Sequence, residues 1–142
     1  ACIAFESAET FSPSIANMAG SGATGLIQFM PSTARGMGTT TEILAGMSAV
    51  GQLRYVHIYM STYAKRIKTL SDMYMAILMP RYIGYPDDTV IFATGIAYRQ
   101  NAGLDTNRNG KITKDEASAK VRSALVKGLR PGNCAAGAMW LA

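Results

Sequence analysis

Residues 22–34 read Gly-Ala-Thr-Gly-Leu-Ile-Gln-Phe-Met-Pro-Ser-Thr-Ala and carry no charged side chain. The glycines favour turns, while Pro31 suits the first turn of a short helix that runs to Arg35. Between them, Gly25 to Phe29 are predicted to form one helical turn. The polar groups of this stretch are amides and hydroxyls, which suit a neutral ligand such as a sugar.

The carboxylate Glu6 lies shortly before this stretch, in residues 1–9, which read as the end of a mostly apolar helix. The sequence from Thr10 to Ala34 that follows has no charge at all. A carboxyl group in apolar surroundings has a raised pKa, because desolvation disfavours the charged form. Glu6 is therefore a candidate general acid. The alternative is an ordinary solvated carboxylate at a helix end.

Composition bounds the remaining possibilities. The chain has 142 residues, of which 49% are hydrophobic and 16% charged, as expected for one globular domain over residues 1–142. No run of about 18 apolar residues is present, so no membrane span is predicted. The net charge of +5 favours a polyanionic partner. Nucleic acid is not the expected partner, because the Lys and Arg residues are scattered without interleaved aromatic residues.

The hydrophobic pattern is overwhelmingly helical, so the predicted fold class is mainly α with few or no short strands. Apolar residues spaced three or four apart from Leu53 to Leu70 predict a long helix beginning after Ser48. Ser71 is predicted to cap a further helix that ends at Pro80. Residues 89–98 fit either a helix or a strand. A last helix is predicted over residues 114–129.

Three blocks of sequence carry a resemblance to a known family. Glu6-Ser7, followed by Phe11-Ser12-Pro13, is similar to the Glu-Ser-x-x-Phe-x-Pro signature of lysozyme-like lytic transglycosylases. Residues 22–34 resemble their Gly-Ala-x-Gly-Leu-x-Gln-x-Met-Pro-x-Thr-Ala block. Residues 97–103, Ala-Tyr-Arg-Gln-Asn-Ala-Gly, resemble their Ala-Tyr-Asn-x-Gly block with two residues interposed. The blocks keep the family's order, which implies a lysozyme-like fold of the α+β superfamily.

The resemblance also implies roles for individual residues. Glu6 matches the catalytic acid, and Tyr98 matches a tyrosine that lies beside it. Gln28 matches a glutamine that binds sugar in the cleft. The interposed residues leave open whether Gln100 or Asn101 makes the contact of the family's asparagine. Ser21 and Phe29 complete the set of expected substrate contacts.

The implied reaction is cleavage of the bond between N-acetylmuramic acid and N-acetylglucosamine in bacterial peptidoglycan. Glu6 would act as acid and then as base, and the product would carry a 1,6-anhydro ring. A classical muramidase needs a second carboxylate. No motif selects one among the candidates Glu9, Glu42, Asp72, Asp87 and Asp88. Glu9 lies three residues after Glu6, where it can share a helix face. A non-catalytic module that binds calcium or wall sugars is a further alternative. The variant third block most resembles phage-encoded lysins and virion-associated murein hydrolases, which act on the cell wall.

Residues 105–116 fit the EF-hand loop pattern D-x-[DN]-x-[DN]-G-x5-E. Side-chain oxygens of Asp105, Asn107 and Asn109, the carbonyl of Lys111 and the carboxylate of Glu116 are the expected ligands of a structural Ca²⁺ ion. No cofactor is expected for catalysis itself. The alternative is a metal-free turn, since Thr113 and Glu116 also have the spacing of a capping box that starts the last helix.

Features outside these motifs are interpreted as structural. His57, the only histidine, is expected to pack partly buried on the long helix. Cys2 and Cys134 are either a disulfide or two small buried thiols. The apolar tail, residues 130–142, is expected to pack back on the domain or to lead into a neighbouring part of a larger protein.

Overall fold

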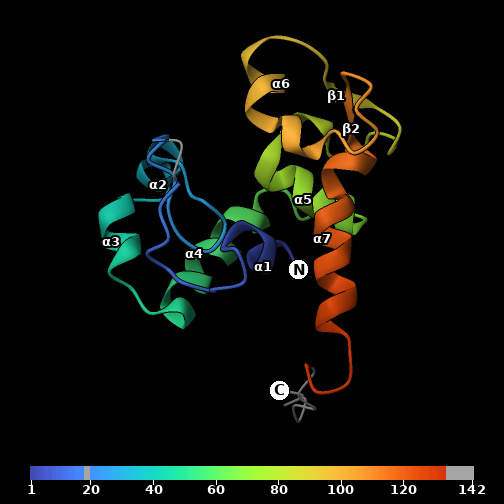
Figure 1. Ribbon diagram of the computed structural model, residues 1–142. Helices are drawn as coiled ribbons and strands as arrows, with labels where there is room; N and C mark the ends of the chain where they lie inside the picture. The colour runs from blue at the N-terminus through green and yellow to red at the C-terminus, as the bar shows by residue number, and fades with distance from the viewer. Residues whose placement is uncertain (18–19, 134–142) are drawn as a thin grey trace.

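The computed structural model describes residues 1–17 and 20–133 (Figure 1). Among these residues the chain is mainly helical, as predicted, with seven α-helices and one two-stranded sheet. The α-helices are α1 (Cys2–Glu6), α2 (Pro31–Gly36), α3 (Thr41–Ala45), α4 (Ala49–Ser61), α5 (Leu70–Leu78), α6 (Gly95–Asn101) and α7 (Lys114–Gly128). The other elements are the strands β1 (Val90–Phe92) and β2 (Ile112–Thr113) and the 3-10 helices η1 (Pro80–Tyr82) and η2 (Ala102–Leu104).

Local capping explains the short helices near the N-terminus. Pro31 begins α2 as predicted, and the Thr40 hydroxyl accepts a hydrogen bond from the backbone N–H of Ile43 to cap α3. The predicted helical turn at Gly25 to Phe29 is wrong. Those residues form a hydrogen-bonded turn closed by a β-bridge between Thr24 and Phe29.

The predicted long helix is interrupted. The helix α4 begins after its Ser48 cap as expected but ends at Ser61, and Thr69 rather than Ser71 caps α5. Residues after Ser61 continue as turns in which backbone N–H groups bond three residues back, as Tyr63 does to Met60. Such turns nearly keep the helical spacing of side chains, so the apolar pattern runs on after the α-helix has ended.

The ambiguous segment 89–98 contains both a strand and the start of a helix. Strand β1 pairs antiparallel with β2, with Val90 opposite Thr113 and Phe92 opposite Ile112, and the chain then enters α6. Strand β2 lies within the EF-hand-like loop and leads directly into α7. The sheet thereby fixes the loop of residues 105–116 next to the first turn of the last helix.

Two clusters of buried side chains form the core. The larger joins α5, α7, the sheet and α1 around Met75, Ile112 and Val121. The smaller gathers Ile27, Phe29, Ala34 and Leu44 from the loop, α2 and α3. Met60 and Ile77 pack against both clusters, so they join the two parts of the molecule.

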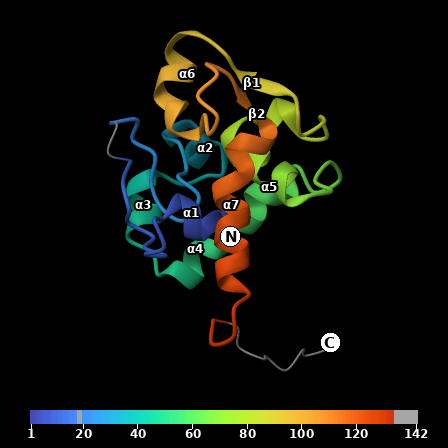
Figure 2. The same ribbon diagram turned by 45° about the vertical axis from the view of Figure 1, so that its right-hand side comes forward.

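Helix α1 lies between these two parts and packs against α7, which brings the first and last helices together (Figures 1 and 2). Within the described residues, no helix is long and apolar enough to cross a membrane. Cys2 is buried in the larger core. Cys2 is a free thiol there, which agrees with the buried-thiol alternative and not with the disulfide. Cys134 falls outside the described residues with the rest of segment 134–142.

Candidate active site

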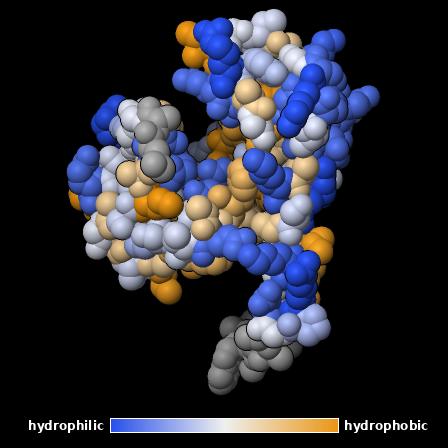
Figure 3. All heavy atoms as spheres, viewed as in Figure 1, coloured by the Kyte–Doolittle hydropathy of each residue, from blue (hydrophilic) through white to orange (hydrophobic). Residues whose placement is uncertain are grey.

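The surface is hollowed between the part built from residues 10–60 and the part that carries α6 (Figure 3). Helix α1 lies between the two parts, and Glu6 is its last residue. The chain turns sharply behind Glu6, because Ala8, Glu9 and Phe11 all have positive φ. The buried Ser7 holds this corner: its hydroxyl accepts the backbone N–H of Phe11 at 3.0 Å, and its carbonyl accepts the Thr10 hydroxyl at 2.6 Å.

Glu6 has the electrostatic environment expected of a general acid. Burial raises its pKa from 4.5 to about 7. No hydrogen bond or ion pair from the described residues reaches its carboxylate, so nothing offsets the cost of desolvating the charge. A carboxyl group with this pKa is partly protonated near neutral pH and can donate a proton or accept one.

Tyr74 is a neighbour of Glu6 that no motif in the sequence marks. Its side chain is 2% exposed, and its ring packs edge-on against Phe5 with 5.6 Å between ring centroids. Burial first, and then the nearby Glu6 charge, raise the pKa of the Tyr74 hydroxyl. Tyr74 thus stays neutral and supplies part of the low-dielectric wall around the carboxyl group.

Glu9 does not share a helix face with Glu6, so that prediction is wrong. The helix α1 ends at Glu6, and Glu9, in the left-handed region, directs its carboxylate to the ammonium group of Lys127 on α7. Two other candidates for a second catalytic carboxylate also have structural partners: Asp72 is buried against Lys114, and Glu42 accepts the Thr41 hydroxyl at the start of α3. No second carboxylate is in hydrogen-bonding contact with Glu6 among the described residues.

Gln28 is held by its own loop. Its side-chain nitrogen donates to the carbonyls of Ile15 at 3.2 Å and Gly25 at 3.1 Å. These two bonds fix the amide and leave its oxygen, Oε1, with no partner among the described residues. The oxygen of Gln28 is therefore available to a donor on a ligand.

A buried amide that sequence reasoning did not single out anchors this loop. Gln52 on α4 is fully buried; its oxygen accepts the N–H of Leu26 at 2.7 Å, and its nitrogen donates to the carbonyls of Pro13 and Leu44 at 3.0 and 2.8 Å. Its three partners are distant in sequence, so no local pattern marks it. Gln52 is a positioning residue for the loop that carries Gln28.

The two expected substrate contacts of this loop, Phe29 and Ser21, lie in different environments. Phe29 is 2% exposed and packs edge-on against Tyr59 in the smaller core. Its predicted role in substrate binding is wrong, because its side chain supports the loop from beneath and offers no surface to a ligand. Ser21 is exposed, and its hydroxyl accepts the N–H of Ala23 at 3.3 Å.

The third block forms α6, on the other side of the hollow. The Tyr98 hydroxyl donates to the Asp105 carboxylate at 2.8 Å, and this bond raises the pKa of Tyr98. Tyr98 therefore anchors α6 to the EF-hand-like loop, and no hydrogen bond or ring contact among the described residues joins it to Glu6. The Asn101 amide donates to its own helix at Ala97, whereas Gln100 is exposed with no hydrogen-bond partner among the described residues. Gln100 is the freer of the two amides.

The EF-hand-like loop is folded around its polar side chains. Asp105 accepts the N–H groups of Asn109 and Gly110, and the oxygens of Asn107 and Asn109 each accept an N–H two residues further on. Gly110 has φ of +81°, a conformation that only glycine adopts readily. Partial burial of Asp105 opposes ionisation, but the hydrogen bonds from Tyr98 and the backbone outweigh it and lower its pKa.

Glu116 closes the loop by the predicted capping box. Its carboxylate accepts the N–H of Thr113 at 3.0 Å, while the Thr113 hydroxyl accepts the N–H of Glu116 at 3.2 Å. The bond from the Thr113 backbone lowers the pKa of Glu116.

His57 differs from the expectation that it packs partly buried, since its side chain is exposed on α4.

Comparison of the chain with protein-family models, curated proteins and solved structures gives no match. The functional argument therefore depends on the geometry above. Within the described part of the chain, no group of three or more His, Cys, Asp or Glu side chains gathers. The site centred on Glu6 accordingly rests on one buried carboxyl group and on the amides around the hollow.

Proposed function

We propose that the chain cleaves the glycan strands of bacterial peptidoglycan at the N-acetylmuramic acid to N-acetylglucosamine β-1,4 bond, as a lytic transglycosylase. The observation that carries the proposal is Glu6, a partly buried carboxyl group with no ion partner among the described residues and a pKa that burial raises to about 7, at the end of the helix between the two parts of the molecule. The fold proposed with it is lysozyme-like, and the supporting sequence features are the three blocks around Glu6, Gln28 and Tyr98.

In this mechanism a single group transfers both protons. Protonated Glu6 donates to the glycosidic oxygen as the bond to C1 of the muramyl residue breaks. The C6 hydroxyl of the same sugar then attacks C1, and the Glu6 carboxylate takes the hydroxyl proton as the 1,6-anhydro ring closes. In this proposal Gln28, whose side-chain oxygen has no partner among the described residues, and the exposed Gln100 would bind the sugar amides and hydroxyls. No motif in the sequence selects a second carboxylate, and this favours the route over hydrolysis, which needs one.

Mass spectrometry of the muropeptides released from purified peptidoglycan tests the proposal. Anhydro-muramyl ends, lighter by one water than reducing ends, are expected with the wild-type chain and are lost in Glu6→Gln. The matched control is Glu9→Gln, which removes a carboxylate three residues away and is expected to keep the activity. Reducing ends would show a muramidase, and no Glu6-dependent product would leave a binding module.

We also infer that residues 105–116 bind a structural Ca²⁺ ion. The oxygens of Asp105, Asn107 and Asn109 face one compact turn, which suits a hard cation that takes oxygen ligands. Lys111 would contribute its backbone carbonyl. Glu116 would contribute its carboxylate, which would give up some of its capping-box hydrogen bonds with Thr113. Two carboxylates are few, so affinity is expected in the range of about 10⁻⁴–10⁻³ M.

A rise in melting temperature with millimolar CaCl₂, absent with MgCl₂ and in Asp105→Asn, is the expected result for the calcium site. No shift in melting temperature would contradict the calcium site and favour the metal-free capping-box turn.

For location, the proposal places the chain at the bacterial cell wall, as part of a phage lysin or virion protein, with peptidoglycan as its partner. Nucleic acid is not a proposed partner.

A further inference from the structure

The positive charge of the chain is concentrated in one segment. Residues 43–86 hold five Lys and Arg side chains and a single acid, Asp72, so this segment supplies four of the five units of net positive charge. Asp72 is itself buried and paired with the ammonium group of Lys114. Every charged side chain that residues 43–86 expose to solvent is therefore basic.

The guanidinium group of Arg66 joins the segment after α4 to the turn η1. Its Nη2 group donates to the carbonyls of Pro80 at 3.3 Å and of Ile83 at 3.2 Å. Those carbonyls lie on either side of Arg81 in the chain, so Arg66 lies against the same turn that presents Arg81. The Nε and Nη1 groups of Arg66 have no hydrogen-bond partner among the described residues and remain available to a ligand.

The buried Asp72 carboxylate makes a second connection between the same two segments. It accepts the backbone N–H of Lys68 at 3.0 Å and that of Gly84 at 2.8 Å. Lys114 neutralises its charge, so the connection places no unpaired acid beside the cations. These contacts bring to one surface the exposed side chains of Lys65, Arg66, Lys68 and Arg81, which we call the basic face.

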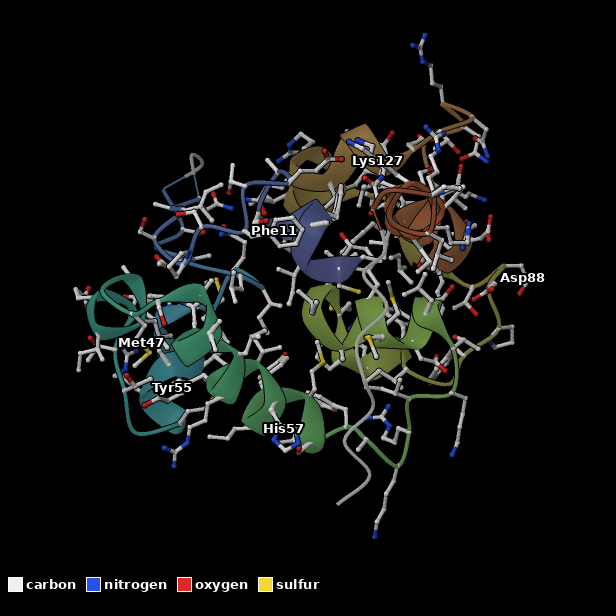
Figure 4. All side chains as sticks on the ribbon, turned by 90° about the horizontal axis from the view of Figure 1, so that it is seen from below. Phe11, Met47, Tyr55, His57, Asp88 and Lys127 are labelled. Atoms are coloured by element: carbon white, nitrogen blue, oxygen red, sulfur yellow. The ribbon has the colours of Figure 1, made fainter. Side chains whose placement is uncertain are left out.

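No carboxylate from the described residues neutralises the basic face, since none of its four cations is in an ion pair. The next acids along the chain are Asp87 and Asp88. Asp87 lies 4.0 Å from the Lys114 ammonium group, and Asp88 lies at the outer edge of the loop that follows Tyr85 (Figure 4). A surface that holds several cations in place without counter-charges attracts a polyanion.

The aromatic side chains beside the basic face are already engaged. The Arg81 guanidinium lies 4.7 Å from the centroid of the Tyr82 ring and donates to the Tyr82 hydroxyl at 3.1 Å. Tyr85, 53% exposed, packs edge-on against Tyr82 with 5.5 Å between ring centroids. Single-stranded nucleic acids bind where successive bases stack on free ring faces, and Arg81 covers a face of Tyr82. The surface therefore favours a polyanion without bases.

We propose that the basic face binds a linear cell-wall polymer whose anionic groups are phosphodiesters. Arginine forks and lysine ammonium groups both bind phosphate, and neighbouring cations can contact successive phosphates of one polymer. The location of this polymer on the cell wall rests on the proposed function, whereas the binding of a phosphodiester chain does not. Such binding would concentrate the protein at the wall surface.

Isothermal titration calorimetry with purified poly(glycerol phosphate) tests the proposal. We expect the whole chain to bind, with an affinity that falls several-fold when NaCl is raised from about 50 to about 200 mM. Lys65→Gln/Lys68→Gln removes two ammonium groups that make no hydrogen bond or ion pair among the described residues. This variant should weaken binding by about tenfold or more, roughly fivefold for each charge that faces the anion. Both positions are exposed, so its circular dichroism should not change.

Lys120→Gln/Arg130→Gln is the matched control, because it removes the same charge from exposed positions on α7 and just after it, outside the basic face. It should change the affinity by less than about twofold, since charges beyond the Debye length are largely screened. Equal losses from the two double variants would overturn the proposal, because the polymer would then respond to net charge alone.

Two further outcomes would also overturn it. One is no binding of the polymer at low salt. The other is tighter binding of single-stranded DNA with the same number of phosphates, which would indicate a nucleic-acid surface. Glu6→Gln should bind poly(glycerol phosphate) as the wild type does, so a failure of the proposed cleavage and a failure of this binding are distinguishable.

Discussion

The carboxyl group of Glu6 is partly buried and has no hydrogen-bond or ion partner among the described residues, which costs stability whenever the group is ionised. Its pKa is about 7 in the folded chain, against an ordinary value of 4.5. A raised carboxyl pKa means that the folded state binds the proton more tightly than the unfolded state. The contribution of Glu6 to stability is therefore complete below pH 4.5 and is lost as the pH rises through 7.

Replacing Glu6 with Gln removes the proton donor and should abolish cleavage. The same change removes the desolvated charge, so it should stabilise the protein at alkaline pH. We expect a gain in the free energy of unfolding of about 2–3 kcal/mol at pH 8 and little change at pH 4. Urea unfolding of the wild type and the variant at pH 4, 6 and 8 measures this difference in the free energy of unfolding. The wild-type cleavage rate should also fall above pH 7, where the proton donor is lost. A Glu6→Gln variant with the wild-type pH profile of stability would contradict the burial.

Gly25 illustrates how one residue can fix the loop that carries Gln28. It has φ of +84°, and a Cβ atom at this position would lie 2.4 Å from the buried Gln52 oxygen. The amide of Gln52 cannot move aside without losing its bonds to Pro13, Leu26 and Leu44. A Cβ atom at position 25 would therefore clash with the Gln52 amide, in addition to the backbone strain that positive φ causes in any residue other than glycine.

Gly25→Ala is expected to destabilise the protein by roughly 2–4 kcal/mol, since it strains the backbone and displaces a buried hydrogen-bonded amide. Gly38→Ala is the matched control, because Gly38 also has positive φ but its Cβ would meet nothing within 4 Å. That change should cost only about 1 kcal/mol. Thermal unfolding compares the two, and equal losses would show that strain alone acts at Gly25.

At the scale of the elements, a buried ion pair joins α5 to α7. The ammonium group of Lys114 lies 2.6 Å from the Asp72 carboxylate, with both side chains at most 4% exposed. Asp72 also accepts the N–H groups of Lys68 and Gly84. Burial opposes its ionisation, but the bonds from Lys114, Gly84 and Lys68 outweigh it and lower the pKa of Asp72 to about 2.

Removing one partner leaves the other charge buried, so Lys114→Met should cost about 3–5 kcal/mol. Because the pKa of Asp72 is lowered, its stabilisation is present above pH 3.8 and is lost as the pH falls towards 2. Urea unfolding between pH 2 and 5 should show this acid loss in the wild type and a flatter profile in the variant. Arg122→Met breaks the exposed pair with Asp115 and should cost about 1 kcal/mol or less.

The elements also show where sequence reasoning ends. Caps and helix starters at Pro31, Thr40, Ser48 and Thr113 act within three or four residues, and each was predictable. The end of α4 at Ser61 was not, because the following 3-10 turns keep an apolar spacing close to that of a helix. Strand β1 was ambiguous for the opposite reason, since its partner β2 lies about twenty residues further along the chain.

At the scale of the whole molecule, the candidate site was predictable in part. Glu6 could be selected because it lies on a mostly apolar helix end before a long uncharged stretch, and the raised pKa that its burial causes agrees with that reasoning. The contact of Tyr98 with Asp105, the core position of Phe29 and the anchoring role of Gln52 depend on residues that meet only in the folded chain. Tertiary packing decides such contacts, and no local spacing encodes them.

The contact between the first and last helices has a consequence for connectivity. Helix α1, near the start of the described chain, packs against α7, near its end, so a linker could join the two and the chain could start in an exposed turn elsewhere. Such a circular permutant would keep the packing of α1 on α7. For this fold, the spatial meeting of those helices matters, whereas their order along the polypeptide is incidental.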